Sequence, residues 1–211
     1  MNLLTLVIKG GYFMVPIALG SLVALAVFIE RYIVLRRARK GTDRISWEIL
    51  ALVKERQEEV AQARCRRSTA PVAKVLLAGL EAGGNRDVAR DGMAMAGQLE
   101  IDTLERRIGW LAIVAAAAPM VGFLGTVTGM IRAFMQVQTH AGQVDASILA
   151  GGIWEALVTT AGGLVVGIPA LIGNNWLVGE IEGLAHQMRR AAVELLRLVP
   201  TQGEDDGPVV V

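Results

Sequence analysis

The chain has 211 residues, of which 53% are hydrophobic and 19% are charged, and its formal net charge is +1. Because an ordinary soluble domain carries roughly 25% charged residues, this composition argues against a water-soluble enzyme. The small net charge gives no reason to expect nucleic-acid binding. A single cysteine, Cys65, excludes an intramolecular disulfide framework and a CxxC zinc site. The 24 glycines favour closely packed membrane helices.

Three apolar segments are long enough to cross a bilayer, whose ~30 Å hydrocarbon core needs about 20 residues of helix. Residues 10–29 and 108–131 contain no charge, and residues 146–179 contain one, Glu155. The first segment is too long for the apolar part of a secretory signal, and its basic cluster follows it, so we expect an uncleaved anchor. The last segment would be roughly 51 Å long as a helix, so it must tilt or continue into water.

Lysine and arginine are distributed unevenly among the connecting segments. Residues 35–107 hold 15 of them, whereas residues 132–145 hold one, Arg132. The positive-inside rule therefore predicts a cytoplasmic loop, a periplasmic N-terminus and a cytoplasmic C-terminus. The predicted organisation is a periplasmic N-terminus and first span (1–34), a cytoplasmic helical loop (35–107), a second span (108–131), a periplasmic loop (132–145), a third span (146–179), and a cytoplasmic helix and tail (180–211).

Hydrophobic periodicity predicts helices outside the membrane as well. An amphipathic pattern covers residues 45–67, and a second helix is expected over residues 72–82, closed by two glycines. From Arg86 onward no proline or glycine pair interrupts the pattern, so we expect one helix to continue from there into the second span. The third span likewise continues to Leu195, with Pro200 marking its end and a disordered tail after it.

Other groups outside the membrane give no strong chemical signal. No GxxxxGK[ST] phosphate-binding loop is present in the sequence. His140 and His186 are predicted on opposite sides of the membrane, which excludes a metal site built by both within one chain, and each is expected at the solvated surface. Cys65 lies between Arg64 and Arg66, which could lower its thiol pKa, although a silent surface cysteine is the simpler interpretation.

Small residues recur every three or four positions in the second and third spans, which places them on one face of each helix. Close helix packing is the simplest interpretation, and it predicts a multi-helix bundle. Pro119 and Pro169 each remove a backbone donor and could bend their helices. The stripes consist of Ala115, Ala118, Gly122, Gly125 and Gly129 in the second span, and of Gly152, Ala156, Thr159, Gly163, Gly167 and Ala170 in the third.

Polar residues interrupt both spans. Thr126 and Thr128 lie in the second span, and Glu155, Thr159 and Thr160 lie in the third. A carboxylate in lipid is costly unless it faces a cavity or a partner, and no lysine or arginine lies inside the spans. Glu155 could be protonated, hydrated or matched by a basic residue of another subunit; a hydrated position at the outer boundary is the simpler alternative. Around an ideal helix Thr159 is about 40° from Glu155, and Thr160 is about 140° away.

Two long motifs resemble one known family. Residues 118–131, APMVGFLGTVTGMI, resemble the second-span signature of the MotA/TolQ/ExbB proton-channel family, and residues 151–170, GGIWEALVTTAGGLVVGIPA, resemble its third-span signature. The first span, ending Ile29-Glu30-Arg31, also looks like this family, and the similarity runs from about Gly11 to Leu195. Three spans look like ExbB or TolQ, because MotA would imply four.

The resemblance implies an all-α integral membrane protein with three transmembrane helices and long cytoplasmic helical extensions. It implies a homopentameric ring in the bacterial inner membrane around helices of an ExbD/TolR-type partner, which supplies an aspartate inside the pore. Proton flow, without a cofactor, would then pull on a TonB/TolA-type effector. The implied proton pathway comprises Thr126, Glu155, Thr159 and Thr160, and the implied packing surface or pore wall comprises Pro119, Gly122, Gly125, Gly129, Gly163, Gly167 and Pro169.

Other functions stay open at this point. A passive membrane scaffold would tolerate apolar replacements of Thr126, Glu155 and Thr160. A membrane enzyme using Glu155 as an acid is weaker, because no second catalytic group accompanies it in the spans, so no enzymatic activity is expected. The motifs do not separate nutrient import of the ExbB kind, envelope maintenance of the TolQ kind and a gliding-type stator.

Overall fold

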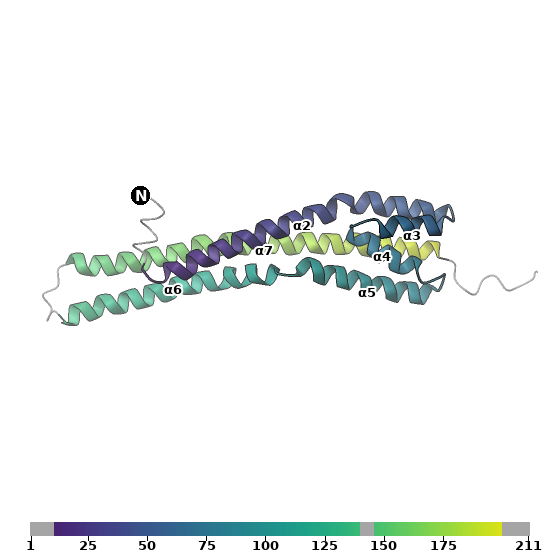
Figure 1. Cartoon of the computed structure of the whole chain (residues 1–211). Helices are drawn as coiled ribbons and strands as arrows, with labels where there is room; N and C mark the ends of the chain where they lie inside the picture. The colour runs from purple at the N-terminus through teal and green to yellow at the C-terminus, as the bar shows by residue number, and fades with distance from the viewer. Residues whose placement is uncertain (1–10, 140–145, 200–211) are drawn as a thin grey trace, which may run out of the picture. The chain divides into compact units, whose positions relative to one another are not determined.

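The computed structural model describes residues 11–139 and 146–199, and every regular element in these ranges is an α-helix (Figure 1). The described part contains α2 (Met14–Lys54), α3 (Glu58–Arg66), α4 (Pro71–Leu80), α5 (Arg86–Glu105), α6 (Ile108–Thr139) and α7 (Ala146–Leu198). Within these described ranges, three segments are long and apolar enough to span a membrane: Met14–Lys54, Ile108–Gln138 and Leu149–Leu198. The expected all-helical membrane protein with three apolar helices is confirmed. His140, Pro200 and the predicted tail lie outside the described residues.

The helices form two compact units. The first, which we term the apolar unit, falls within Met1–Glu30 and Arg107–Leu177; the second, the polar unit, falls within Arg31–Arg106 and Val178–Val211. Helices α2 and α7 each contribute one end to each unit. The described part of the apolar unit contains only four charged residues, which are Glu30, Arg107, Arg132 and Glu155.

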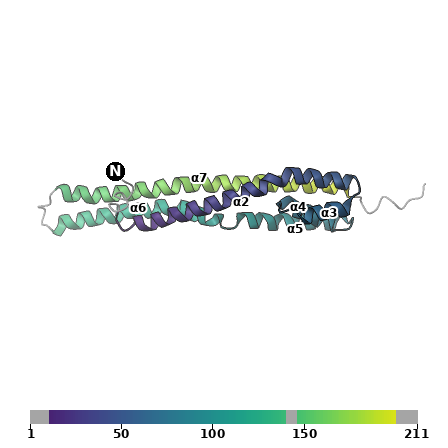
Figure 2. The ribbon, with the colours of Figure 1, turned by 45° about the horizontal axis from the view of Figure 1, so that its top comes forward.

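In the apolar unit, α6 and the first part of α7 run side by side, and the start of α2 packs against them (Figures 1 and 2). Gly20 of α2 faces Val114 of α6, and Gly173 of α7 faces Phe28 of α2. Both α6 and α7 continue through their internal prolines. Large apolar side chains such as Leu22 are exposed on the outside of this unit, as expected of helices that face lipid.

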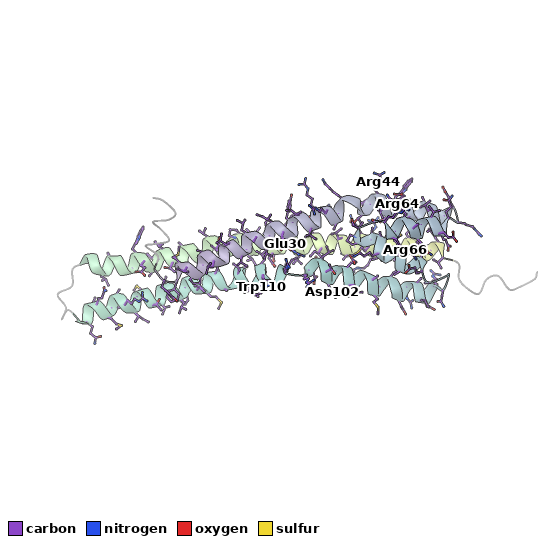
Figure 3. The ribbon with its side chains drawn as sticks, viewed as in Figure 1. Glu30, Arg44, Arg64, Arg66, Asp102 and Trp110 are labelled. Carbon is purple, nitrogen blue, oxygen red and sulfur yellow. The ribbon has the colours of Figure 1, made fainter. Side chains whose placement is uncertain are left out.

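The polar unit has a conventional hydrophobic core. Ile49 of α2, Leu76 of α4 and Leu195 of α7 are each 0% exposed. Outside the core, Arg64 of α3 holds Glu48 with two hydrogen bonds, from Nε at 2.6 Å and from Nη2 at 3.2 Å. These bonds lower the pKa of the Glu48 carboxyl. Figure 3 labels Arg64 together with Arg44, Arg66 and Asp102 of the same unit.

The end of α2 differs from the predicted separate helix over residues 45–67. Helix α2 runs unbroken from the first span to Lys54, and α3 begins at Glu58. The Gln57 N–H donates to the Leu52 carbonyl at 2.9 Å, and the Arg56 N–H donates to the Val53 carbonyl at 3.0 Å. This Schellman pattern places Arg56 at φ 58°, where glycine is usual. The break was missed because neither glycine nor proline marks it.

The predicted continuous helix from Arg86 into the second span is wrong. Helix α5 ends at Glu105 and α6 begins at Ile108, with Arg107 between them at φ 72°. A left-handed conformation costs a non-glycine residue roughly 1–2 kcal/mol, so contacts elsewhere must compensate for it. One of them is the Arg107 Nη1 bond to Glu30 Oε1 of α2 at 2.7 Å, which sequence periodicity does not report. Figure 3 labels Glu30 on its helix.

Cys65 also differs from expectation. Its side chain is 2% exposed in the core of the polar unit, and burial raises the pKa of its thiol to about 11. Both the lowered pKa and the surface position are therefore wrong, because desolvation outweighs the neighbouring guanidinium of Arg64. His186 is exposed, as expected. Within the described ranges, no group of three or more potential metal ligands is present.

Candidate functional site

The small-residue stripes of α6 and α7 face each other within one chain. A Cβ atom at Gly163 would lie 2.5 Å from the Ala118 carbonyl oxygen, and one at Gly122 would lie 3.0 Å from the Thr159 carbonyl oxygen. Such distances leave no room for a side chain, because the opposing atoms belong to the backbone. The close approach of α6 and α7 therefore requires glycine at both positions.

The same contact continues toward both ends of the helix pair. A Cβ atom at Gly167 would meet the Pro119 ring at 2.5 Å, and one at Gly129 would meet the Ala156 methyl at 3.0 Å. We call this surface the α6–α7 seam. It comprises Ala115, Ala118, Pro119, Gly122, Gly125, Gly129 and Ala133 on α6, and Gly152, Ala156, Thr159, Thr160, Gly163 and Gly167 on α7.

Two of the predicted threonines lie within this seam. Thr160 Oγ1 donates across it to the Gly122 carbonyl at 2.9 Å. Thr159 is 1% exposed, contacts Gly125 through its methyl group, and donates its hydroxyl to the Glu155 carbonyl at 2.8 Å. Thr160 therefore links the two helices, and Thr159 fills the space that Gly125 leaves.

Thr126 lies at the border of the seam. Its side chain is half-buried, and its Oγ1 donates to the Phe123 carbonyl of its own helix at 2.6 Å. Because Thr126 follows Gly122 by four residues, it lies about one helical turn from the carbonyl that Thr160 binds. Thr126 therefore lies within about one helical turn of the α6 residue that Thr160 contacts.

The carboxylate of Glu155 has two neighbours that the sequence interpretation did not identify. Its Oε1 is 4.0 Å from Arg132 Nη1, at the limit of an ion pair. It also packs against the backbone of Gly11, which has φ +71° and precedes α2. None of the states proposed for Glu155 included a basic residue of the same chain. The sequence does indicate this proximity, because Arg132 directly follows the second span and Glu155 lies near the start of the third span, which runs antiparallel to the second.

Glu155 and Thr160 contact α6 at different places. The carboxylate of Glu155 approaches Arg132, whereas the hydroxyl of Thr160 donates to the Gly122 carbonyl. On α7 itself the two residues are five positions apart, which corresponds to about 7.5 Å along the helix. Their side chains therefore use separate contacts on α6.

Farther along α7 lie Pro169 and an amide that the sequence interpretation missed. Pro169 is exposed and lines a groove with Phe28 and Leu111. Asn174 is half-buried, and its Nδ2 is 3.4 Å from the Oδ1 of Asn175. Thr160, Gly167 and Asn174 are spaced by seven residues and so lie near one face of α7. The sequence shows two adjacent uncharged polar residues here, Asn174 and Asn175, which a search for charged residues alone does not detect.

Comparison with known proteins agrees with these features. Residues 67–190 match the MotA/TolQ/ExbB proton channel family. The chain belongs to this family. The match includes all of α6, the α6–α7 seam and Glu155, and the expected resemblance is confirmed.

Individual relatives of the family are similar over different lengths. The Tol-Pal system protein TolQ of Haemophilus influenzae is 44% identical over 85 residues, which cover 40% of this chain and 37% of the relative. The putative biopolymer transport protein ExbB-like 1 of Synechocystis is 32% identical over 168 residues, or 78% of this chain and 66% of the relative. The biopolymer transport protein ExbB of Neisseria gonorrhoeae is 38% identical over 85 residues, or 37% of this chain and 38% of the relative.

Family membership and the three apolar helices together establish the class of protein. The chain is a multi-pass α-helical membrane protein of an ExbB/TolQ-like proton channel family. The family is of a transport type rather than an enzymatic one.

Proposed function

We propose that this chain is the ring-forming subunit of a proton-driven motor or channel in the bacterial inner membrane. Five copies surround the transmembrane helices of a single-span partner of the ExbD/TolR type. Proton flow through this complex does work on a periplasmic effector of the TonB/TolA type. The chain is not an enzyme and needs no cofactor, since the proton itself is the coupling ion.

The observation that carries this proposal is the pair of threonine hydroxyls at the α6–α7 seam of a proton-channel family member. Thr160 donates to Gly122 of α6, and Thr126 lies one turn farther along the same helix. A hydroxyl that donates one hydrogen bond keeps lone pairs that accept others. Both hydroxyls can therefore hold water or a protonated partner group while their own hydrogens stay bonded to the backbone.

The seam itself favours this function over a passive scaffold. The glycines of both stripes are occupied by packing within the chain, at Gly122, Gly163 and Gly167. One charge that crosses 100 mV releases ~2.3 kcal/mol, which can drive a conformational step without ATP.

Replacement of Thr160 tests the proposal. We expect Thr160→Val, in the complex with its single-span partner reconstituted in proteoliposomes, to reduce proton flux at least about tenfold, because valine has the shape of threonine but no hydroxyl. Thr160→Ser should retain most of the flux, because it keeps the hydroxyl.

Thr128→Val is the matched control, since Thr128 bonds only carbonyls of its own helix, at 2.9 and 3.1 Å. The mass of the intact complex should show the same number of subunits for all three variants. Wild-type flux in a fully assembled Thr160→Val complex would overturn the role of Thr160.

A further inference from the structure

A group of basic side chains follows the first apolar span on one face of α2. Arg36, Arg37 and Lys40 are exposed, and together with Tyr32 and Ile33 they line one hollow of the surface. Tyr32, Arg36 and Lys40 are spaced by four residues, as are Ile33 and Arg37, which places all five on one side of the helix. We call this surface the basic patch.

The other face of this part of α2 packs within the polar unit. Leu35 and Ala38 are buried there, and Arg39 is bonded to Glu180 of α7 at 2.7 Å. In the part of the chain that the structure describes, no carboxylate forms an ion pair with a residue of the basic patch. The three positive charges of the patch are therefore available to an anion from outside the chain.

The position of the basic patch along α2 indicates which anion it would meet. About twenty residues of helix, counted from the start of α2 at Met14, end at Ile33 and are enough to cross the hydrocarbon core. Lys40 lies seven residues, or about 10 Å, beyond Ile33, and long basic side chains extend back toward the interface. A bilayer that encloses the apolar part of α2 therefore brings phospholipid headgroups to the patch.

We propose that the basic patch binds the headgroup phosphate of an anionic phospholipid in the adjacent leaflet. Arg36, Arg37 and Lys40 hold the phosphate, to which a guanidinium group can donate two parallel hydrogen bonds. Tyr32, which is 38% exposed, lies at the level of the headgroups, as interfacial aromatic side chains do. Ile33, which is 43% exposed, contacts the acyl chains.

A lipid is favoured over an acidic protein by the order of the residues along α2. The apolar and aromatic side chains of the patch lie on the side of the span, and the charged side chains lie beyond them. A phospholipid has the same order, with acyl chains followed by an anionic headgroup. The inference does not rest on the proposed function, because its test measures lipid binding and not proton flux.

Native mass spectrometry of the purified full chain in detergent tests this inference. The protein is mixed with equal amounts of phosphatidylglycerol and phosphatidylcholine that have the same acyl chains. We expect phosphatidylglycerol to be retained in preference, because it alone of the two has a net negative charge. The triple variant Arg36→Gln, Arg37→Gln, Lys40→Gln should lower the ratio of bound phosphatidylglycerol to bound phosphatidylcholine at least about tenfold, since each basic residue near the headgroups contributes about fivefold.

A second triple variant is the matched control. Lys54→Gln, Arg56→Gln and Arg86→Gln together remove the same charge from exposed positions of the polar unit and should keep the wild-type ratio. Lys54 lies 14 residues beyond Lys40, or about 21 Å farther along α2, and Arg56 lies in the turn that follows it. Arg86 begins α5 at the end opposite to the second span.

Several outcomes would overturn the inference. Equal retention of the two lipids by the wild-type chain would do so, as would a wild-type ratio in the basic-patch variant. An equal loss in both triple variants would show a response to net charge alone. Displacement of phosphatidylglycerol by inorganic phosphate at constant ionic strength would identify a site for free phosphate. If the basic-patch variant cannot be purified, Arg37→Gln alone should lower the ratio about fivefold, and an unchanged ratio would overturn the inference.

Discussion

Single glycines decide how closely α6 and α7 approach. At Gly163 and Gly122 the opposing atoms are backbone atoms, which cannot move aside as a flexible side chain would. At Gly151, near the start of α7, no atom of the described residues lies within 4 Å of the Cβ position. Two glycines of one helix therefore differ completely in what a methyl group would meet.

This difference predicts opposite effects of the same substitution. Gly163→Ala should destabilise the protein by about 1–3 kcal/mol, the usual cost of overpacking. Gly151→Ala should be neutral or stabilising by up to about 1 kcal/mol, because alanine has the higher helix propensity. Thermal unfolding of the two purified variants in the same detergent measures this, and equal melting temperatures would contradict the assignment of Gly163 to the seam.

At the scale of the element, α2 ends where two capping hydrogen bonds form rather than where its sequence contains a helix breaker. The turn after Lys54 requires a left-handed residue, and Arg56 occupies that position at φ 58°. The residue directly after α3, its C-cap Arg67, has φ −83° and is unstrained. The two arginines follow neighbouring helices but occupy different backbone conformations.

Substitution by glycine should therefore stabilise the protein at Arg56 and not at Arg67. We expect Arg56→Gly to raise the free energy of unfolding by about 1 kcal/mol, because it relieves the left-handed strain. Arg67→Gly should bring no gain, because glycine there only adds freedom to the unfolded chain. Melting temperatures of both variants provide the measurement, and a lower value for Arg56→Gly would show that the arginine side chain contributes more than its strain costs.

At the scale of the whole molecule, the charge distribution follows the division into an apolar and a polar unit. Most lysines and arginines lie in the polar unit, where Arg64 and Arg66 pair with carboxylates. We expect that unit in the cytoplasm, because positively charged loops are retained there. The ends of α6 and α7 near Arg132 and Glu155 would then face the periplasm.

Cysteine labelling in intact cells tests this orientation. The natural thiol of Cys65 is buried and is replaced by alanine for the experiment. Trp47→Cys, at a site 77% exposed in the polar unit, should react with an impermeant maleimide only after the cells are opened. Gln138→Cys, at an exposed site near the end of α6, should react in intact cells. The reverse pattern would contradict the predicted orientation.

The sequence by itself determined the helical class, the three apolar helices and the family, because these depend on composition and on spacing along the chain. The tertiary structure alone decided that Thr160 bonds Gly122, that Arg132 approaches Glu155, and that a break separates α5 from α6 at Arg107. The pore-lining roles of Thr126 and Thr160 stay predictions. The physical reason is that these contacts join residues that are far apart in the sequence. Periodicity indicates which face of a helix is apolar, but it does not indicate which distant segment will pack against that face.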